Sequence, residues 1–338
     1  MAFEEAPEQS APLAQTDASR EPPPACPART PSSAKTSVSR ARIGIWGALA
    51  GLGRLSQRLR LILDALIFRH TLFSLPFAAM AILLESAGRP PFSKVLLILI
   101  AAAAGRNAAN ALNRVIDAGI DAKNPRTRER HIPKGLLSKK TLFCTALVLI
   151  IVLVIAAFLL NPLCVLLLPL AGFLIGGYSY SKRFTWLCHY WLGTACACSV
   201  MGSFIGLSGH FALRYFVLSG AHALWVAGFD ILYALPDIEF DRREGLYSVP
   251  SRFGAPLARV FASGSHLGTI AGLFLVPFFW KLSVYYWPAA ACAALLLVIE
   301  HLIALGKTER HIRLASYSIN ELVPLILLAG TAAGIYSR

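Results

Sequence analysis

The chain has 338 residues, of which 56% are hydrophobic and only 15% charged, and its formal net charge is +14. A soluble domain this apolar would have too little polar surface, so the composition excludes an ordinary soluble protein and favours a multi-span membrane protein. A basic excess also suits nucleic acid, but here the basic residues are distributed as in a membrane protein. No nucleic acid partner is therefore predicted.

Residues 1–45 are predicted to form a disordered N-terminal tail. They are rich in Pro, Ala, Ser and Thr, carry charges of both signs and show no apolar period. Glu4, Glu5 and Glu8 precede the first basic residue and no apolar core follows, which is not the pattern of a signal peptide. Residues 46–338 are predicted to form a transmembrane domain.

The apolar runs of this domain predict an all-α, polytopic membrane protein. Almost every run exceeds the roughly 18 residues that identify a bilayer-spanning helix. About nine transmembrane helices are expected, near residues 62–84, 94–117, 141–160, 163–180, 189–208, 215–235, 258–280, 284–303 and 316–336.

Lys and Arg concentrate in alternate loops, after residues 117, 180, 235 and 303. The opposite loops and the C-terminus hold only Arg89, Lys94, Arg214, Lys281 and Arg338. Cytoplasmic loops of membrane proteins carry such an excess of positive charge. The pattern predicts an odd number of spans, a cytoplasmic N-terminus and, if the protein is bacterial, an inner-membrane location.

Two acidic clusters follow apolar runs on the predicted cytoplasmic side. Asn113, Asp117 and Asp121 are spaced by four residues, and so are Asp237 and Asp241, in a chain with only 18 acidic residues. Residues four apart share a helix face, so each cluster is expected to form a stripe. Carboxylates are costly near lipid, and two facing stripes would suit one or two Mg²⁺ ions. Alternatively, the first cluster caps a helix boundary and pairs with nearby basic residues.

Phosphate-binding types of residue accompany both clusters. Guanidinium and ammonium groups neutralise phosphate oxygens while carboxylates take a metal, which is the division that a diphosphate site requires. Ordinary positive charge of cytoplasmic loops explains some of these residues. The candidates for binding the diphosphate are Arg126 and Arg130 after the first cluster, Lys182 and Arg183 at the end of the fourth span, and Ser248 after the second cluster.

Several motifs in order resemble the UbiA superfamily of membrane prenyltransferases. They are Asn113-x3-Asp117-x3-Asp121 with its Arg-Thr-x-x-Arg tail, Tyr178-Ser-x-x-Lys-Arg, and Asp230-x6-Asp237-x3-Asp241-x3-Gly245-x2-Ser248. The resemblance covers roughly residues 60–336.

This resemblance implies nine helices around a central cavity, with a cytoplasmic cap that holds an isoprenoid diphosphate through Mg²⁺. It assigns the metal to Asn113, Asp117, Asp121, Asp237 and Asp241. Arg114 stands where relatives often have Asp, which removes one possible ligand.

The implied reaction is ionisation of an allylic diphosphate followed by attack of an electron-rich aromatic carbon. Asp117 and Asp237 would act catalytically through the metal. Asp230 matches a family position near the acceptor and would orient or deprotonate its phenol. The alternative for Asp230 is an ion pair with the intramembrane cation Arg106.

The stretch Phe68–Ala78 resembles the 4-hydroxybenzoate polyprenyltransferase branch. It predicts Mg²⁺-dependent transfer from a polyprenyl diphosphate to an aromatic acid, foremost 4-hydroxybenzoate, in respiratory quinone biosynthesis. The alternative acceptor is 1,4-dihydroxy-6-naphthoate, in a futalosine-type menaquinone pathway. Arg106 and His70 are candidates for the acceptor carboxylate, and Tyr178 is a further substrate-binding candidate.

A membrane transporter is the alternative of another class, since transporters also place acids in membrane helices. They set them near the middle of the membrane on broken helices. Here both clusters lie at helix ends beside basic residues, which favours an enzyme.

Overall fold

The structure, a computed structural model, describes residues 56, 57, 59–66, 68–306 and 319–338, and the side chains of residues 68–73 are outside this description. The predicted tail 1–45 and the His70 side chain therefore lie outside the described residues. Every regular element in the described part is helical, as predicted. The elements in chain order are α2 (Phe68–Glu85), α3 (Phe92–Ile116), α4 (Ala118–Lys123), α5 (Lys139–Leu160), α6 (Pro162–Ser181), α7 (Cys188–Ser208), α8 (Tyr215–Tyr233), η1 (Leu235–Asp237), α9 (Ile238–Arg243), α10 (Val249–Trp280), η2 (Val284–Tyr286), α11 (Trp287–Ala304) and α13 (Asn320–Tyr336).

Seven helical segments of the described residues are long and apolar enough to cross a membrane: α3, α5, α6, α7, α8, α10 and η2 with α11. Shorter apolar helices occupy Ser74–Glu85 and Asn320–Tyr336. These two correspond to the predicted spans 62–84 and 316–336, which both include residues outside the description. The protein is thus an integral, multi-pass membrane protein, and the count of nine spans stays a prediction.

Sequence signals at the helix ends explain where the spans begin and end. Ser138 caps α5 by accepting a hydrogen bond from the Thr141 amide at 3.0 Å. Asn161 ends α5, and its side chain caps α6 by accepting from the Cys164 amide at 3.0 Å. Along both helices, many Leu, Ile and Phe side chains are exposed, which in a membrane protein places them against lipid.

Glycines bring α7, α8 and α10 into close contact. A Cβ atom at Gly193 of α7 would lie 2.2 Å from the carbonyl oxygen of Ala223 in α8. A Cβ atom at Gly228 of α8 would lie 2.3 Å from the ring of His266 in α10. Small residues permit this approach of backbones in membrane bundles. These three helices are therefore held at short range.

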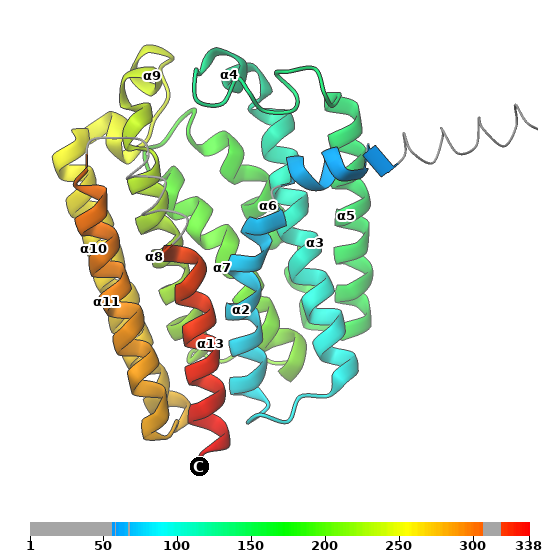
Figure 1. The fold of residues 1–338 in the computed structure, drawn as a ribbon. Coiled ribbons are helices and arrows are strands. Elements are labelled where there is room, and N and C mark those ends of the chain that lie inside the picture. The colour runs from blue at the N-terminus through cyan, green and yellow to red at the C-terminus, as the bar shows by residue number, and fades with distance from the viewer. Residues whose placement is uncertain (1–55, 58, 67, 307–318) are drawn as a thin grey trace, which may run out of the picture. The chain divides into compact units, whose positions relative to one another are not determined.

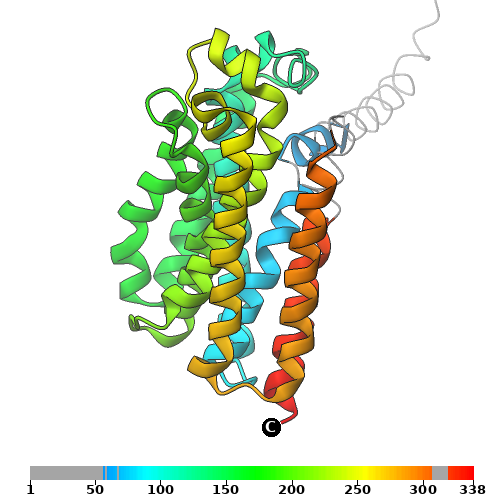
Figure 2. The ribbon, with the colours of Figure 1, turned by 90° about the vertical axis from the view of Figure 1, so that its left-hand side faces the viewer.

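The short helices α4 and α9 lie at one end of the bundle, and the C-terminus lies at the other (Figures 1 and 2). Lys123 pairs with Glu244 at 2.6 Å, which connects the end of α4 to the end of α9. The Tyr247 amide donates to the Lys182 carbonyl oxygen at 2.7 Å, which attaches the same loop to the end of α6. The cap that contains both acidic clusters is thus tied together by contacts between distant segments.

Candidate active site

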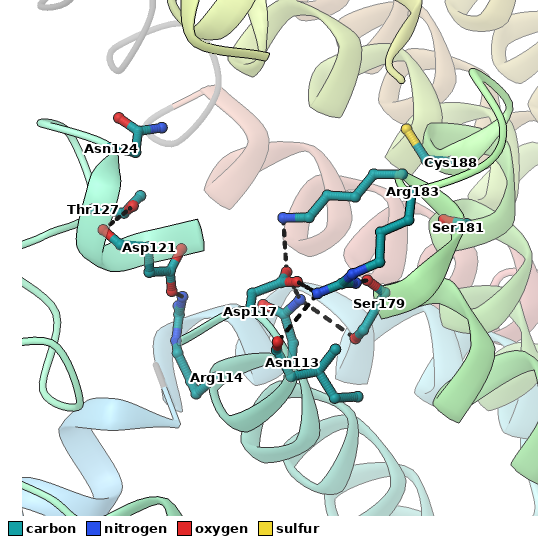
Figure 3. Close-up of polar contacts among 12 residues, drawn as sticks. Asn113, Arg114, Asp117, Asp121, Asn124, Thr127, Ser179, Ser181, Arg183 and Cys188 are labelled. Atoms are coloured by element: carbon teal, nitrogen blue, oxygen red, sulfur yellow. Dashed lines mark hydrogen bonds and ion pairs between the residues drawn. The ribbon is translucent and has the colours of Figure 1, made fainter. Parts of the chain in front are cut away.

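Asp117 ends α3 and precedes α4, and it is only 2% exposed. Its carboxylate accepts from the Asn113 amide at 2.7 Å, from Lys182 Nζ at 2.8 Å and from Arg183 Nη2 at 3.0 Å (Figure 3). Ser179 lies beside them, with its Oγ 3.3 Å from Asn113 Nδ2. The first predicted cluster and the Lys-Arg pair at the end of the fourth span therefore meet in space.

Asp121 belongs to a separate group within the same cap. Arg130 Nη1 donates to both of its carboxylate oxygens, at 2.7 and 2.8 Å, and Arg114 lies 4.0 Å away. Figure 3 shows Asp121 facing Arg114 while Asp117 faces Asn113 and Arg183. The expected stripe along one continuous helix is wrong, because the backbone leaves helical geometry at Asp117 (φ −90°, ψ 1°).

The second cluster is broken in the same way, because Asp237 closes η1 and Asp241 lies in α9. Arg126 forms a two-point ion pair with Asp237, and its Nε donates to Oδ1 at 3.0 Å. The Asn124 amide donates to the same oxygen at 3.1 Å. The guanidinium of Arg126 also lies over the ring of Tyr233, 4.3 Å from its centroid.

Asp241 differs from the other carboxylates because a hydroxyl, rather than a basic side chain, donates to it. Ser248 Oγ donates to its Oδ2 at 3.0 Å. Burial raises the pKa of Asp241 to about 6, and the neighbouring Asp237 adds to the rise. At pH 7 this carboxyl group is still mainly ionised.

Both acidic clusters lie at the same end of the bundle and are connected through the segment that carries Asn124 and Arg126 (Figure 1). The carboxylates of Asp117, Asp121 and Asp237 each pair with Lys or Arg. The structure therefore does not show the expected division, in which carboxylates bind a metal and basic groups bind phosphate. The expected alternative of local ion pairs describes this arrangement. Basic side chains therefore occupy oxygens of these three carboxylates.

The donor set has the oxygen chemistry that Mg²⁺ requires. Among the described residues, no three His, Cys, Asp or Glu side chains converge as a metal cage. Mg²⁺ is ordinarily bound through one or two carboxylates together with substrate phosphates and water, so a full protein cage is not needed. Asp117 with Asn113, and Asp237 with Asp241, fit this mode of binding.

An apolar cavity of about 520 Å³ lies among α3, α5, α6, α7 and α8. Its lining on α7 runs from Leu192 to Ile205, which corresponds to about 20 Å along the helix. Tyr178 lines it toward the cap, donating from its hydroxyl to the Ala109 carbonyl oxygen at 3.2 Å. Because Tyr178 adjoins Ser179, this end of the cavity reaches the first acidic cluster.

Arg106 also lines the cavity, within the membrane-spanning part of α3. It donates to the Cys196 sulfur, and its Nε is buried without a hydrogen-bond partner. Within the described part of the chain, no carboxylate lies within ion-pair distance of its guanidinium. Asp230 instead pairs with His189, with 2.7 Å between His189 Nδ1 and Asp230 Oδ2. The alternative ion pair of Asp230 with Arg106 is therefore wrong.

Sequence reasoning missed His189 and Cys196. Both stand in an apolar run without ligand spacing, and their partners are 41 and 90 residues away in the chain. A polar side chain in a membrane span is a weak signal of function, and it was the only one available.

The fold and the site define a polytopic, all-helical membrane enzyme with a polar cap above an apolar cavity. The sequence profile of the UbiA prenyltransferase family matches residues 74–320, and the chain belongs to this family. It is therefore a prenyltransferase, and the transporter alternative is wrong.

Similar proteins include the 4-hydroxybenzoate octaprenyltransferase of Xanthomonas euvesicatoria pv. vesicatoria (strain 85-10), which is 30% identical over 259 residues, covering 76% of this chain and 85% of that protein. A protein of the same name from Vibrio campbellii is 27% identical over 255 residues, covering 74% and 87%. Among solved structures, the apo structure of a UbiA homolog from Aeropyrum pernix K1 matches with a TM-score of 0.71 and 31% identity, covering 78% of this chain and 97% of that one. A UbiA homolog from Archaeoglobus fulgidus bound to GPP and Mg²⁺ shares the fold, with a TM-score of 0.64 and 17% identity over 82% and 99% of the chains.

Proposed function

We propose that the protein catalyses Mg²⁺-dependent transfer of a polyprenyl group from polyprenyl diphosphate to 4-hydroxybenzoate in respiratory quinone biosynthesis. Its family, the names of its relatives and the acidic clusters support prenyl transfer. The observation that supports an aromatic acid as the acceptor is the environment of Arg106. Its guanidinium lies in an apolar cavity and has no carboxylate partner in the described part of the chain. Such a cation is costly in a membrane unless an anion joins it.

The cap residues bind the diphosphate. Asp117, with Asn113, and Asp237, with Asp241, hold Mg²⁺, while Lys182, Arg183, Arg126 and Arg130 turn from their carboxylate partners to phosphate oxygens. When bound, Mg²⁺ supplies positive charge that stabilises the leaving diphosphate. The basic side chains lie within 3.0 Å of the carboxylates they would leave, so small rotations suffice.

The donor tail occupies the apolar cavity. Three main-chain bonds of an extended peptide span about 3.3–3.6 Å, so an isoprene unit with four chain bonds spans about 4.5 Å, and about four units fill 20 Å of cavity. The remaining units of a longer donor extend into lipid past the exposed lining residues Leu170 and Phe216.

The acceptor lies between Arg106 and Asp230. Arg106 binds its carboxylate, and Asp230, whose side chain is 27% exposed, receives the phenol. The polar cap, and hence the chemistry, faces the cytoplasm, because the basic loops belong to that side. In a bacterium the enzyme would then lie in the inner membrane.

An acceptor panel with purified enzyme tests the proposal. We expect 4-hydroxybenzoate to be prenylated in the presence of Mg²⁺ and plain phenol to react poorly. Arg106→Gln should raise the acceptor KM about 10- to 100-fold, because a hydrogen-bonded ion pair is lost. Arg89→Gln, at an exposed position in an opposite loop, is the control. Equal turnover of phenol would contradict the assignment of Arg106 to the acceptor carboxylate. Preference for 1,4-dihydroxy-6-naphthoate would show that this compound, and not 4-hydroxybenzoate, is the acceptor.

A further inference from the structure

We propose that His189 is a positioning residue that acts through Asp230 to orient the carboxylate that takes the acceptor's phenolic proton. The inference rests on the proposed function and adds to it a residue outside the motifs that suggested that function. His189 comes from α7 and Asp230 from α8, so the pair exists only when these helices pack against one another.

The geometry of the pair is that of a base held by a second side chain. His189 Nδ1 donates to Asp230 Oδ2 at 2.7 Å, and the His189 side chain is only 4% exposed. Its other ring nitrogen, Nε2, is buried and has no hydrogen-bond partner among the described residues. The short hydrogen bond of this imidazole is therefore directed at Asp230, and the Cys188 side chain lies beside the ring. Asp230 keeps its second oxygen for another contact, since its side chain remains partly exposed.

The pair also lies where the reacting atoms must meet. Ala223 of α8 lines the cavity, and Asp230 follows it by seven residues, which returns to the same helix face two turns nearer the cap. Leu192 and Cys196 of α7 line the cavity, and His189 precedes them by three and seven residues on the same face. Both side chains thus continue the cavity wall toward the acidic clusters.

Electrostatic links place the pair between the two halves of the site. Cys196 Sγ accepts from Arg106 and lies within electrostatic range of Asp230, so the candidate partners of the acceptor's carboxylate and phenol lie near the same side chain. The Asp241 carboxylate in the cap interacts with His189. An acceptor anchored on Arg106 would therefore present its hydroxyl to Asp230 below the bound diphosphate.

The donor's C–O bond breaks and its electron pair leaves with the diphosphate. The phenolic proton passes to Asp230, the ring carbon beside the phenolate forms the new C–C bond, and the proton on that carbon then leaves to restore aromaticity. Asp230 returns its proton to the phenolate oxygen, so one proton and diphosphate are released. His189 keeps its Nδ1 proton throughout and holds Asp230 in place.

Two substitutions at His189 distinguish the loss of its hydrogen bond to Asp230 from a change in side-chain size. His189→Leu removes the donor, whereas His189→Asn keeps an amide N–H at the same number of bonds from Cα as Nδ1. We expect His189→Leu to lower kcat with 4-hydroxybenzoate about 10- to 100-fold, below the full contribution of a general base. His189→Asn should stay within a few fold of wild type. Donor KM and Mg²⁺-dependent binding of an unreactive prenyl thiodiphosphate should be unchanged in both.

The acidity of the acceptor distinguishes a positioning role from a purely structural one, because a structural defect would slow all acceptors equally. A ring-fluorinated 4-hydroxybenzoate ionises more readily and needs less help from a base, so the ratio of wild-type to His189→Leu rates should be smaller with it. Equal ratios with both acceptors would overturn the inference, and so would a His189→Asn enzyme as slow as His189→Leu.

If His189→Leu fails to fold, Asp230→Asn with His189 intact takes its place. Its loss of rate relative to wild type must be smaller with the fluorinated acceptor than with 4-hydroxybenzoate, and equal losses would overturn the inference. Failure of the proposed function is distinguishable, because then the wild-type enzyme itself would prenylate none of these aromatic acids.

Discussion

The buried Asp117 illustrates how single side chains shape this site, because one carboxylate receives an amide, an ammonium and a guanidinium. A charge this buried is stable only while its partners remain, and breaking one side leaves the other uncompensated. An arriving metal–diphosphate supplies both signs of charge at once. We therefore propose that a ligand carrying both signs of charge replaces these ion pairs.

Asp117→Ala should lower prenyl transfer at least about 100-fold, since a group that stabilises the leaving charge is lost. Glu239→Ala is the matched control, because Glu239 is an exposed acid on α9 between Asp237 and Asp241. The measurement is product formation from labelled donor in membranes of matched expression. Equal loss in both variants would show a general effect of removing acidic charge from the cap.

Removing the metal should reproduce the loss without any substitution. Excess EDTA should abolish transfer, and Mg²⁺ added beyond the chelator should restore it, because the carboxylates and basic groups alone provide too little net positive charge to stabilise the diphosphate. The check is activity before chelation, after it and after re-addition. Full activity in EDTA would be incompatible with the assigned role of the acidic clusters.

At the scale of elements, the packing of α7 against α8 determines whether His189 and Asp230 meet. The glycine contact at Gly193 leaves no room for a side chain, because its nearest neighbour is the backbone of α8. Backbone cannot yield as a flexible side chain does. The close approach of the two helices at this point thus depends on the absence of a side chain at Gly193.

Gly193→Ala should destabilise the protein by about 1–3 kcal/mol through overpacking. Gly176→Ala in α6 is the matched control, since a Cβ atom there meets nothing within 4 Å. Thermal unfolding of the two variants in the same detergent makes the comparison. Equal melting temperatures would show that α7 and α8 are not held at the described distance.

The buried Glu300 of α11 is a second contact between elements, and it serves structure. Its Oε1 accepts from the Asn320 amide of α13 at 3.0 Å, and Asn320 in turn accepts from the Trp225 indole of α8 at 2.7 Å. The other oxygen of Glu300, Oε2, lies 3.9 Å from His266 Nδ1 of α10, so this carboxyl group is linked, directly or through Asn320, to three further helices of the bundle.

Glu300→Gln, which keeps the acceptor oxygen, should change stability by less than about 1 kcal/mol, whereas Glu300→Ala should cost about 2 kcal/mol or more by leaving the Asn320 amide unsatisfied. Thermal unfolding of the two variants is the measurement. Similar losses in both would indicate that the ionised carboxylate matters.

At the scale of the whole molecule, the chain separates polar chemistry from an apolar interior along the bundle. The cap with both acidic clusters lies at one end and the C-terminus at the other (Figures 1 and 2). With the basic loops in the cytoplasm, the C-terminus should lie outside. A C-terminal alkaline phosphatase fusion should accordingly be active in bacteria. An active fusion at Arg128 in the cap loop would instead show that the cap faces away from the cytoplasm.

Much of this arrangement was predictable from sequence because it depends on local signals. Long apolar runs predict the spans, and the motifs place both clusters at the same end. Helix geometry at Asp117 and Asp237 was mispredicted, since spacing alone does not show where a helix ends. The alternative ion pair of Asp230 with Arg106 was wrong, and the His189 contact could not be predicted, because it arises only from the packing of α7 against α8. The cavity, assembled from five helices, leaves no spacing signal in the chain.

If Asp117 and Asp237 hold one shared Mg²⁺–diphosphate, a double-mutant cycle measures their coupling directly. Binding of a prenyl thiodiphosphate is measured with Mg²⁺ for wild type, Asp117→Asn, Asp237→Asn and the double variant. A shared ligand predicts a coupling energy of about 0.5–3 kcal/mol, because the second substitution removes less once the first has disrupted the site. Additive losses within about 0.5 kcal/mol would show that the two clusters act independently and would contradict the account.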